Sequence, residues 1–179
     1  MNAARSKSSK HGQQVKRVSR ETKVNSAIAA LSRSLLSRAS IKDISSLVLK
    51  HSKSLTNSEL GFVGHIDKNT GCLVVPTFVG DIWDVCQIKD KTFVFKDFSG
   101  LWGWVLQNRK PLFSNKPSSD RRSSGTPSGH LPIHRFLSVR SLVQGELVGQ
   151  ISLANSDRNY LKTYFRYSVK ERNLRIIPK

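Results

Sequence analysis

Two strand-length runs of apolar positions lie near the carboxyl end of the chain. They cover residues 136–143 and 147–154, and only Gln144-Gly145-Glu146 separates them. A connection this short favours a tight antiparallel hairpin, because its glycine adopts a positive φ at low cost. A hairpin with so many apolar side chains is not stable alone in water. We therefore expect it to be the middle of a larger sheet.

Upstream of this hairpin the apolar spacing indicates helices. Val24, Ile28, Leu31 and Leu35 recur at steps of three and four residues and predict a helix over 23–37. Ser40 begins the run Ser-Ile-Lys-Asp, which is typical of a helix N-terminus, and predicts a second helix over 40–56.

Four further runs predict strands, at 60–66, 72–78, 92–95 and 112–114. The turn residues at 67–71 join the first two as a hairpin, and Pro76 indicates an edge strand or a bulge. Residues 100–108 have a helical pattern. The polar loop 115–129 has the length that is typical of lids and binding loops. Helices and strands mixed in this order predict an α+β fold.

Charge divides the chain into three parts. Its 179 residues have a formal net charge of +18, and the two ends hold an excess of Lys and Arg. We expect a disordered basic tail over 1–22, one folded domain over 23–157 and a basic carboxyl-terminal segment over 158–179. Basic tails raise the alternative of nucleic-acid binding, but the first tail has no aromatic residue for base stacking. Nucleic acid is therefore not the partner that we expect.

Several classes of protein are excluded by what the sequence lacks. Two cysteines exclude a disulfide-rich scaffold and a four-cysteine metal site. No apolar run reaches the roughly 18 residues of a spanning helix, and no signal peptide is present, so we expect a cytoplasmic protein without a membrane partner. No phosphate loop, zinc-protease motif or nucleophile elbow occurs, and we expect a chain that is not an enzyme.

The order of these elements resembles the GAF domain, a sensory module related to the PAS domain. The segments that match its first strand, its mid-domain helix and its last strand are 58–64, 100–105 and 146–155. Residues 81–86 and 130–133 are similar to segments in GAF domains of bacterial and archaeal sensor histidine kinases. The resemblance implies a central antiparallel sheet of five or six strands, with helices on one face and a ligand pocket on the other.

The resemblance also implies a function. Such a domain binds a small molecule or cofactor and relays its presence through its terminal helices, here in a two-component-type system, as a homodimer or with a partner signalling kinase. Members normally continue from the last strand into a long amphipathic helix. Segment 158–179 loses the apolar pattern after Val169 and contains Pro178, so its output helix is truncated or atypical. A dimerisation module without a ligand is the structural alternative.

The ligand-binding residues that we predict come from the mid-domain helix and the segments around it: Phe78, Trp83, Cys86, Leu101, Trp104, His130 and Arg135. Tryptophan suits the wall of an apolar pocket, although plain core packing is the alternative for Trp104. In some members a cysteine tethers haem or a bilin, so Cys86 with His130 would be the anchor if a tetrapyrrole binds. Otherwise Cys86 is a small buried residue. Arg135 suits an anionic ligand, although the cyclic-nucleotide signature of certain GAF domains is absent.

Overall fold

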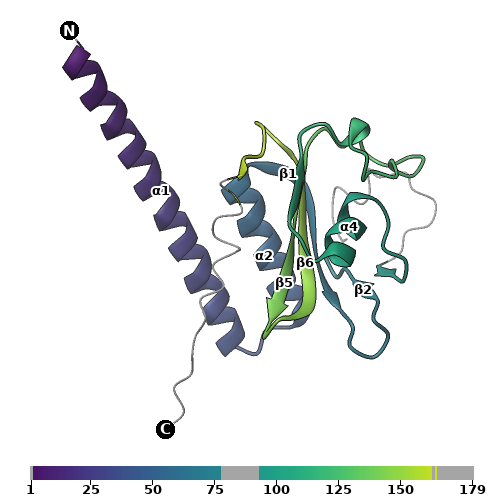
Figure 1. Cartoon of the computed structure of the whole chain (residues 1–179). Helices are drawn as coiled ribbons and strands as arrows, with labels where there is room; N and C mark the ends of the chain where they lie inside the picture. The colour runs from purple at the N-terminus through teal and green to yellow at the C-terminus, as the bar shows by residue number, and fades with distance from the viewer. Residues whose placement is uncertain (1, 78–92, 163, 165–179) are drawn as a thin grey trace.

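The computed structural model describes residues 2–77, 93–162 and 164. Its elements are α1 (Asn2–Leu36), α2 (Ile41–Thr56), β1 (Ser58–Ile66), β2 (Leu73–Val74), β3 (Val94–Phe95), α4 (Gly100–Asn108), β4 (Leu112–Ser114), the 3-10 turn η1 (Pro117–Ser119), β5 (Phe136–Val143) and β6 (Glu146–Ser156). Figure 1 shows three layers, with α1 and α2 on one side of the sheet and α4 on the other. The α+β class is confirmed.

The sheet has six antiparallel strands in the order β3-β2-β1-β6-β5-β4. Strand β6 pairs with β1 on one side and with β5 on the other, so the predicted hairpin does lie at the centre. Gln144 and Gly145 form its turn, with φ of 52° and 85°. The expectation of a five- or six-stranded antiparallel sheet is confirmed.

Helix α2 is held at both ends and packs on β1. Its first turn has a capping box, in which the Ser40 hydroxyl accepts a hydrogen bond from the Asp43 N–H at 3.1 Å and the Asp43 carboxylate accepts one from the Ser40 N–H at 3.3 Å. Asn57 ends the helix in the left-handed conformation. Leu49 then packs on a buried cluster that contains Leu137 and Leu153 of β5 and β6.

Helix α1 is longer than the sequence pattern predicts. It begins at Asn2, whereas the apolar spacing begins near residue 23, so the segment predicted as a disordered tail is part of this helix. Residues 1–22 contain no proline, and ten of them are Ala, Lys, Arg or Gln, which are good helix formers. A helix nucleated by packing of Ala27 can continue through such residues, because each added residue costs little once a turn exists.

Strand β2 is shorter than predicted. It covers Leu73–Val74 instead of 72–78, and the Val75 N–H donates to the Phe93 carbonyl at 2.8 Å just after the strand. Pro76 has no N–H to continue the ladder, which gives the physical reason. The predicted pocket residues Phe78, Trp83 and Cys86 lie outside the described residues.

Candidate functional site

The face of the sheet that α4 covers carries two apolar clusters. One contains Leu101 and Val105 of α4 with Leu112 and Phe136 of β4 and β5. The other contains Leu106 of α4 with Leu73 and Val75 from the β2 side of the sheet. These clusters fix α4 on the sheet, on the side opposite α2 (Figure 1).

Three polar side chains lie at the middle of this face, and we call Ser138, Gln150 and Ser152 the central polar cluster. Ser138 and Gln150 are 0% exposed and Ser152 is 1% exposed. The Gln150 Nε2 lies 2.7 Å from Ser138 Oγ and 2.9 Å from Ser152 Oγ, and the two hydroxyls lie 2.9 Å apart. An apolar layer is thus interrupted by a hydrogen-bonded group on the two central strands.

The contact with α4 sets the orientation of the Gln150 amide. Its Nε2 lies 3.1 Å from the carbonyl oxygen of Trp102. A carbonyl oxygen only accepts hydrogen bonds, so the amide nitrogen must be on that side. The amide oxygen, Oε1, is buried and has no hydrogen-bond partner in the part of the chain that the structure describes. A buried acceptor left without a donor costs about 1–3 kcal/mol.

Arg140 lies on β5, the strand next to Gln150. It is the cross-strand partner of Gln150 in the β5/β6 register, and directly opposite residues of an antiparallel pair point to the same face. Its Nε is buried and, among the described residues, has no partner either. Since a guanidinium remains charged at all physiological pH values, an unpaired buried nitrogen of this group is costly. An unsatisfied donor and an unsatisfied acceptor therefore belong to directly opposite residues of neighbouring strands.

The predicted pocket residues within the structure occupy different places. Leu101 is buried in the first apolar cluster, and Trp104 packs half-buried against the same cluster. His130 lies in the loop before β5, where its Nδ1 is 2.6 Å from the Leu131 carbonyl oxygen. Arg135 donates from Nη1 to the Ser156 carbonyl at 3.0 Å, at the end of β6. Trp104, His130 and Arg135 make none of the hydrogen bonds that define the central polar cluster.

Sequence reasoning missed the central polar cluster. Ser138, Gln150 and Ser152 alternate with apolar residues, and such alternation commonly means a solvent-facing side of a strand. One signal was available, because Gln150 stands in a dense apolar run, where a polar side chain facing water is less expected.

The loop over 115–129 is anchored to α4. Asp120 and Arg122 form a bidentate ion pair with two contacts of 2.8 Å, and the Arg122 guanidinium lies 5.2 Å from the centre of the Trp104 ring. The hydrogen bonds from Arg122 hold the pKa of Asp120 well below its usual range. The outward side of Trp104 therefore binds the loop.

The described part of the chain, residues 2–77, 93–162 and 164, contains no group of three or more His, Cys, Asp or Glu side chains that could hold a metal ion. Nor does it contain a helix that is long and apolar enough to cross a membrane.

Comparison with known proteins is consistent with this fold. The chain is 30% identical over 124 residues to the methyl sulfide methyltransferase-associated sensor of Methanosarcina acetivorans, which covers 68% of this chain but 12% of that protein. The GAF domain of a phosphoenolpyruvate-protein phosphotransferase from Coxiella burnetii superposes with a TM-score of 0.60 at 15% identity, over 79% of this chain and 83% of that one.

A GAF domain from A. aeolicus, crystallised in an inactive state, has a TM-score of 0.56 at 19% identity, over 78% of this chain and 83% of that one. At such identities these two structures support the fold alone. The sequence model of the GAF domain matches residues 38–166, from the start of α2 to beyond β6. This chain therefore belongs to the GAF domain family.

Proposed function

We propose that this chain is a signal-sensing domain that binds a small molecule on the α4 face of its sheet. Family membership supports a sensory role, and the relative from M. acetivorans is itself named a sensor. Because this chain spans 12% of that relative, the activity and partners of the longer protein are not carried over.

The observation that carries ligand binding is the unsatisfied Gln150 Oε1. Buried polar groups in folded proteins are nearly always hydrogen-bonded. Here a wholly buried side chain on the central strand leaves its acceptor without a donor in the described structure, and its register partner Arg140 has an unpaired Nε. A bound molecule that supplies the missing partners would convert this cost into binding free energy.

Relay of occupancy to the terminal helices is the second part of the proposal. Tyr160 is 1% exposed, and its hydroxyl lies 2.7 Å from Ser58 Oγ at the start of β1. Its ring stacks edge-on with Tyr164, and the Arg20 guanidinium of α1 lies 5.2 Å from the Tyr164 ring centre. The segment after β6 thus joins the sheet to α1, and a shift of the sheet would reach α1 through these rings.

Asn115 connects the loop at 115–129 to the same segment. Its amide oxygen accepts from the Tyr160 N–H at 2.9 Å, and its amide nitrogen donates to the Tyr160 carbonyl at 3.1 Å. Loop, carboxyl-terminal segment and α1 therefore form one chain of contacts. A two-component partner, such as a signalling kinase, would bind α1 and respond to a change in its position.

The proposal is tested with the full chain and a fractionated extract of small metabolites. We expect at least one fraction to raise the Tm and to slow hydrogen exchange in β5, β6 and α1 together. A Gln150→Met variant, similar in size but without the amide, should lose the response, while the exposed Gln144→Met control should keep it. Fractions that never change the Tm, with a chain that remains folded, would refute ligand sensing.

A haem or bilin bound through Cys86 and His130 is a separate part of the prediction, because Cys86 is outside the described residues. The absorbance spectrum of the chain purified with haem or bilin supplied in the growth medium tests it directly. A Soret or bilin band that a Cys86→Ser variant lacks would support the anchor. A spectrum with protein absorbance alone would eliminate it.

A dimerisation module is the second candidate, and α1 favours it. The helix exposes apolar side chains at Ile28, Leu35 and Leu36, with exposed fractions of 55%, 63% and 86%. Ile28 and Leu35 are seven residues apart, so they lie on one face of the helix. Dimerisation and ligand binding are compatible, and a homodimer through α1 is the assembly that we propose.

A further inference from the structure

We propose that the molecule bound on the α4 face is a small carboxylate with a hydrogen-bond donor next to its carboxyl group, held between Arg140 and Gln150. A 2-hydroxy or 2-amino acid has this chemistry. The inference rests on the proposed function, since it names the chemical class of the ligand for the same site.

The positive charge of Arg140 determines the sign of the charge that the ligand carries. Within the described residues, the recorded ion pairs occupy Asp120 with Arg122 and Asp157 with Arg158, and none includes Arg140. Its Nε–H is buried without an acceptor. A guanidinium prefers a carboxylate as its acceptor, because charge-assisted bonds are about twice as strong as neutral ones. The ligand atom facing Arg140 is therefore an anionic oxygen.

The amide of Gln150 determines which chemical group of the ligand lies next to its carboxylate. Its nitrogen is committed to the Trp102 carbonyl at 3.1 Å, so the free position is the acceptor Oε1. An acceptor requires an O–H or N–H from the ligand. Because Arg140 and Gln150 are directly opposite in the register, their Cβ atoms are about 4.5–5.5 Å apart, and the ligand must carry its donor close to its carboxylate.

Burial limits the size of the ligand. Gln150 is 0% exposed, and the Trp102 carbonyl of α4 lies against its amide. The apolar clusters on both sides join α4 to the sheet through Val105 and Leu106, which are 0% and 3% exposed. A large planar cofactor would require α4 to leave the sheet, whereas a molecule of a few heavy atoms would require a smaller displacement of α4. Size therefore favours a small acid over a nucleotide or tetrapyrrole at this position.

A purely structural role for Gln150 explains less of the geometry. Docking of α4 accounts for the bond from Nε2 to Trp102, and a serine hydroxyl accepts the second N–H of the amide. A structural role for Gln150 accounts neither for its unpaired Oε1 nor for the unpaired Nε of Arg140. A direct bond between those two atoms in solution is the competing arrangement, and the experiment must distinguish it.

The experiment uses three matched probes and the ¹H–¹⁵N spectrum of the full chain. Glycolate has the carboxylate and the adjacent hydroxyl, acetate lacks the hydroxyl, and glycolamide lacks the charge. We expect glycolate to shift the Arg140 Nε–H and Gln150 amide resonances, and to bind at least about tenfold more tightly than acetate or glycolamide, which corresponds to about 1.4 kcal/mol.

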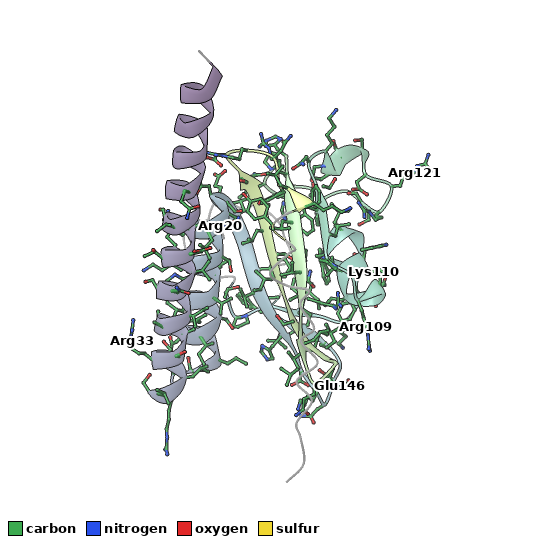
Figure 2. All side chains as sticks on the ribbon, turned by 60° about the vertical axis from the view of Figure 1, so that its left-hand side comes forward. Arg20, Arg33, Arg109, Lys110, Arg121 and Glu146 are labelled. Atoms are coloured by element: carbon green, nitrogen blue, oxygen red, sulfur yellow. The ribbon has the colours of Figure 1, made fainter. Side chains whose placement is uncertain are left out.

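Variants distinguish binding at this site from nonspecific binding of the anion to the surface, which is expected for a chain of net charge +18. Arg140→Gln should weaken glycolate binding at least about tenfold. Arg33→Gln is the control with the same change in charge, since Figure 2 shows Arg33 on α1, far from the α4 side of the molecule where Arg109 and Lys110 lie. Gln150→Glu should abolish glycolate binding, because its own carboxylate would pair with Arg140, although it also removes the donor to the Trp102 carbonyl.

Each outcome has one meaning. Equal loss of binding in Arg140→Gln and Arg33→Gln would assign glycolate to the general surface charge and overturn the inference. So would an Arg140 Nε–H that is bonded to Gln150 Oε1 in the free protein and that no probe shifts. If the probes fail while a metabolite fraction still raises the Tm through Gln150, the ligand class is wrong and the sensing function stands. If the fractions fail as well, both proposals fall.

Discussion

At the scale of single residues, Gly103 determines how closely α4 approaches the segment before it. A Cβ atom at this position would overlap the backbone of Phe98, including its carbonyl oxygen at 2.8 Å. Backbone atoms cannot move aside as the end of a long side chain can. Trp102, the neighbour of Gly103, packs edge-on against the rings of Phe95 and Phe98, so this close approach also places the carbonyl that orients Gln150.

Gly103→Ala should therefore destabilise the chain. Alanine gains about 0.5–1 kcal/mol of helix propensity over glycine, whereas overpacking costs about 1–3 kcal/mol. The net effect should therefore be a lower free energy of unfolding. Urea denaturation followed by circular dichroism measures the net effect. Unchanged or increased stability would mean that α4 can shift away from Phe98, and the central polar cluster would then not be rigidly placed.

At the scale of elements, the start of α2 depends on its capping box. Ser40 and Asp43 satisfy each other's backbone N–H groups, which no helical carbonyl can reach. Ser40→Ala should lower the free energy of unfolding by about 1 kcal/mol. Ser46→Ala, an exposed change inside the same helix, is the matched control and should be neutral or slightly stabilising. Equal effects in the two variants, measured by urea denaturation, would contradict the role of the cap.

The loop over 115–129 is the second element with a testable anchor. Because its ion pair with Arg122 lowers the pKa of Asp120, this carboxyl contributes stability at neutral pH, which is lost as the pH falls below about 4 toward the folded-state pKa. The side chain of Arg122 is 38% exposed, so solvent screening limits the contribution to less than about 1 kcal/mol.

Asp120→Asn should lower the Tm slightly at pH 7, and the difference from the unchanged chain should disappear as the pH falls through the acidic range. Thermal unfolding at several pH values measures this. Asp97→Asn is the control, since that carboxylate has no recorded ion pair within the described residues. A difference that grows with acidity would mean that the assigned direction of the pKa shift is wrong.

At the scale of the whole molecule, the amino-terminal part of α1 projects beyond the three layers (Figure 1). Its apolar positions Ile28 and Leu35 remain more than half exposed in the single chain. If α1 is the homodimer contact, Ile28→Glu with Leu35→Glu should shift the chain from dimer to monomer in sedimentation equilibrium. Ser19→Glu with Ser26→Glu adds the same charges at exposed polar positions on another face of the helix and should leave the dimer intact. A monomeric unchanged chain would refute the proposed contact.

Local pattern determined much of the architecture without any structure. Helix α4 at Gly100–Asn108 and strands β4 and β5 have the bounds that their sequence patterns predict, because each is bordered by its own turn or capping residues. The family resemblance then predicted the sheet and its two faces. The bounds of α4, β4 and β5 depend on residues that are close in sequence, whereas the sheet joins distant parts of the chain and was expected from the resemblance alone.

Tertiary structure alone decided where the polar chemistry lies. The central polar cluster combines Ser138 of β5 with Gln150 and Ser152 of β6, and the Trp102 carbonyl that orients the amide comes from α4. Alternation along one strand shows that two faces differ, but not which of them a helix elsewhere in the chain will cover. Strand β6 pairs between β1 and β5, and α4 docks onto these strands. Side chains whose pattern indicated a solvent-facing position are therefore the most buried polar group of the described fold.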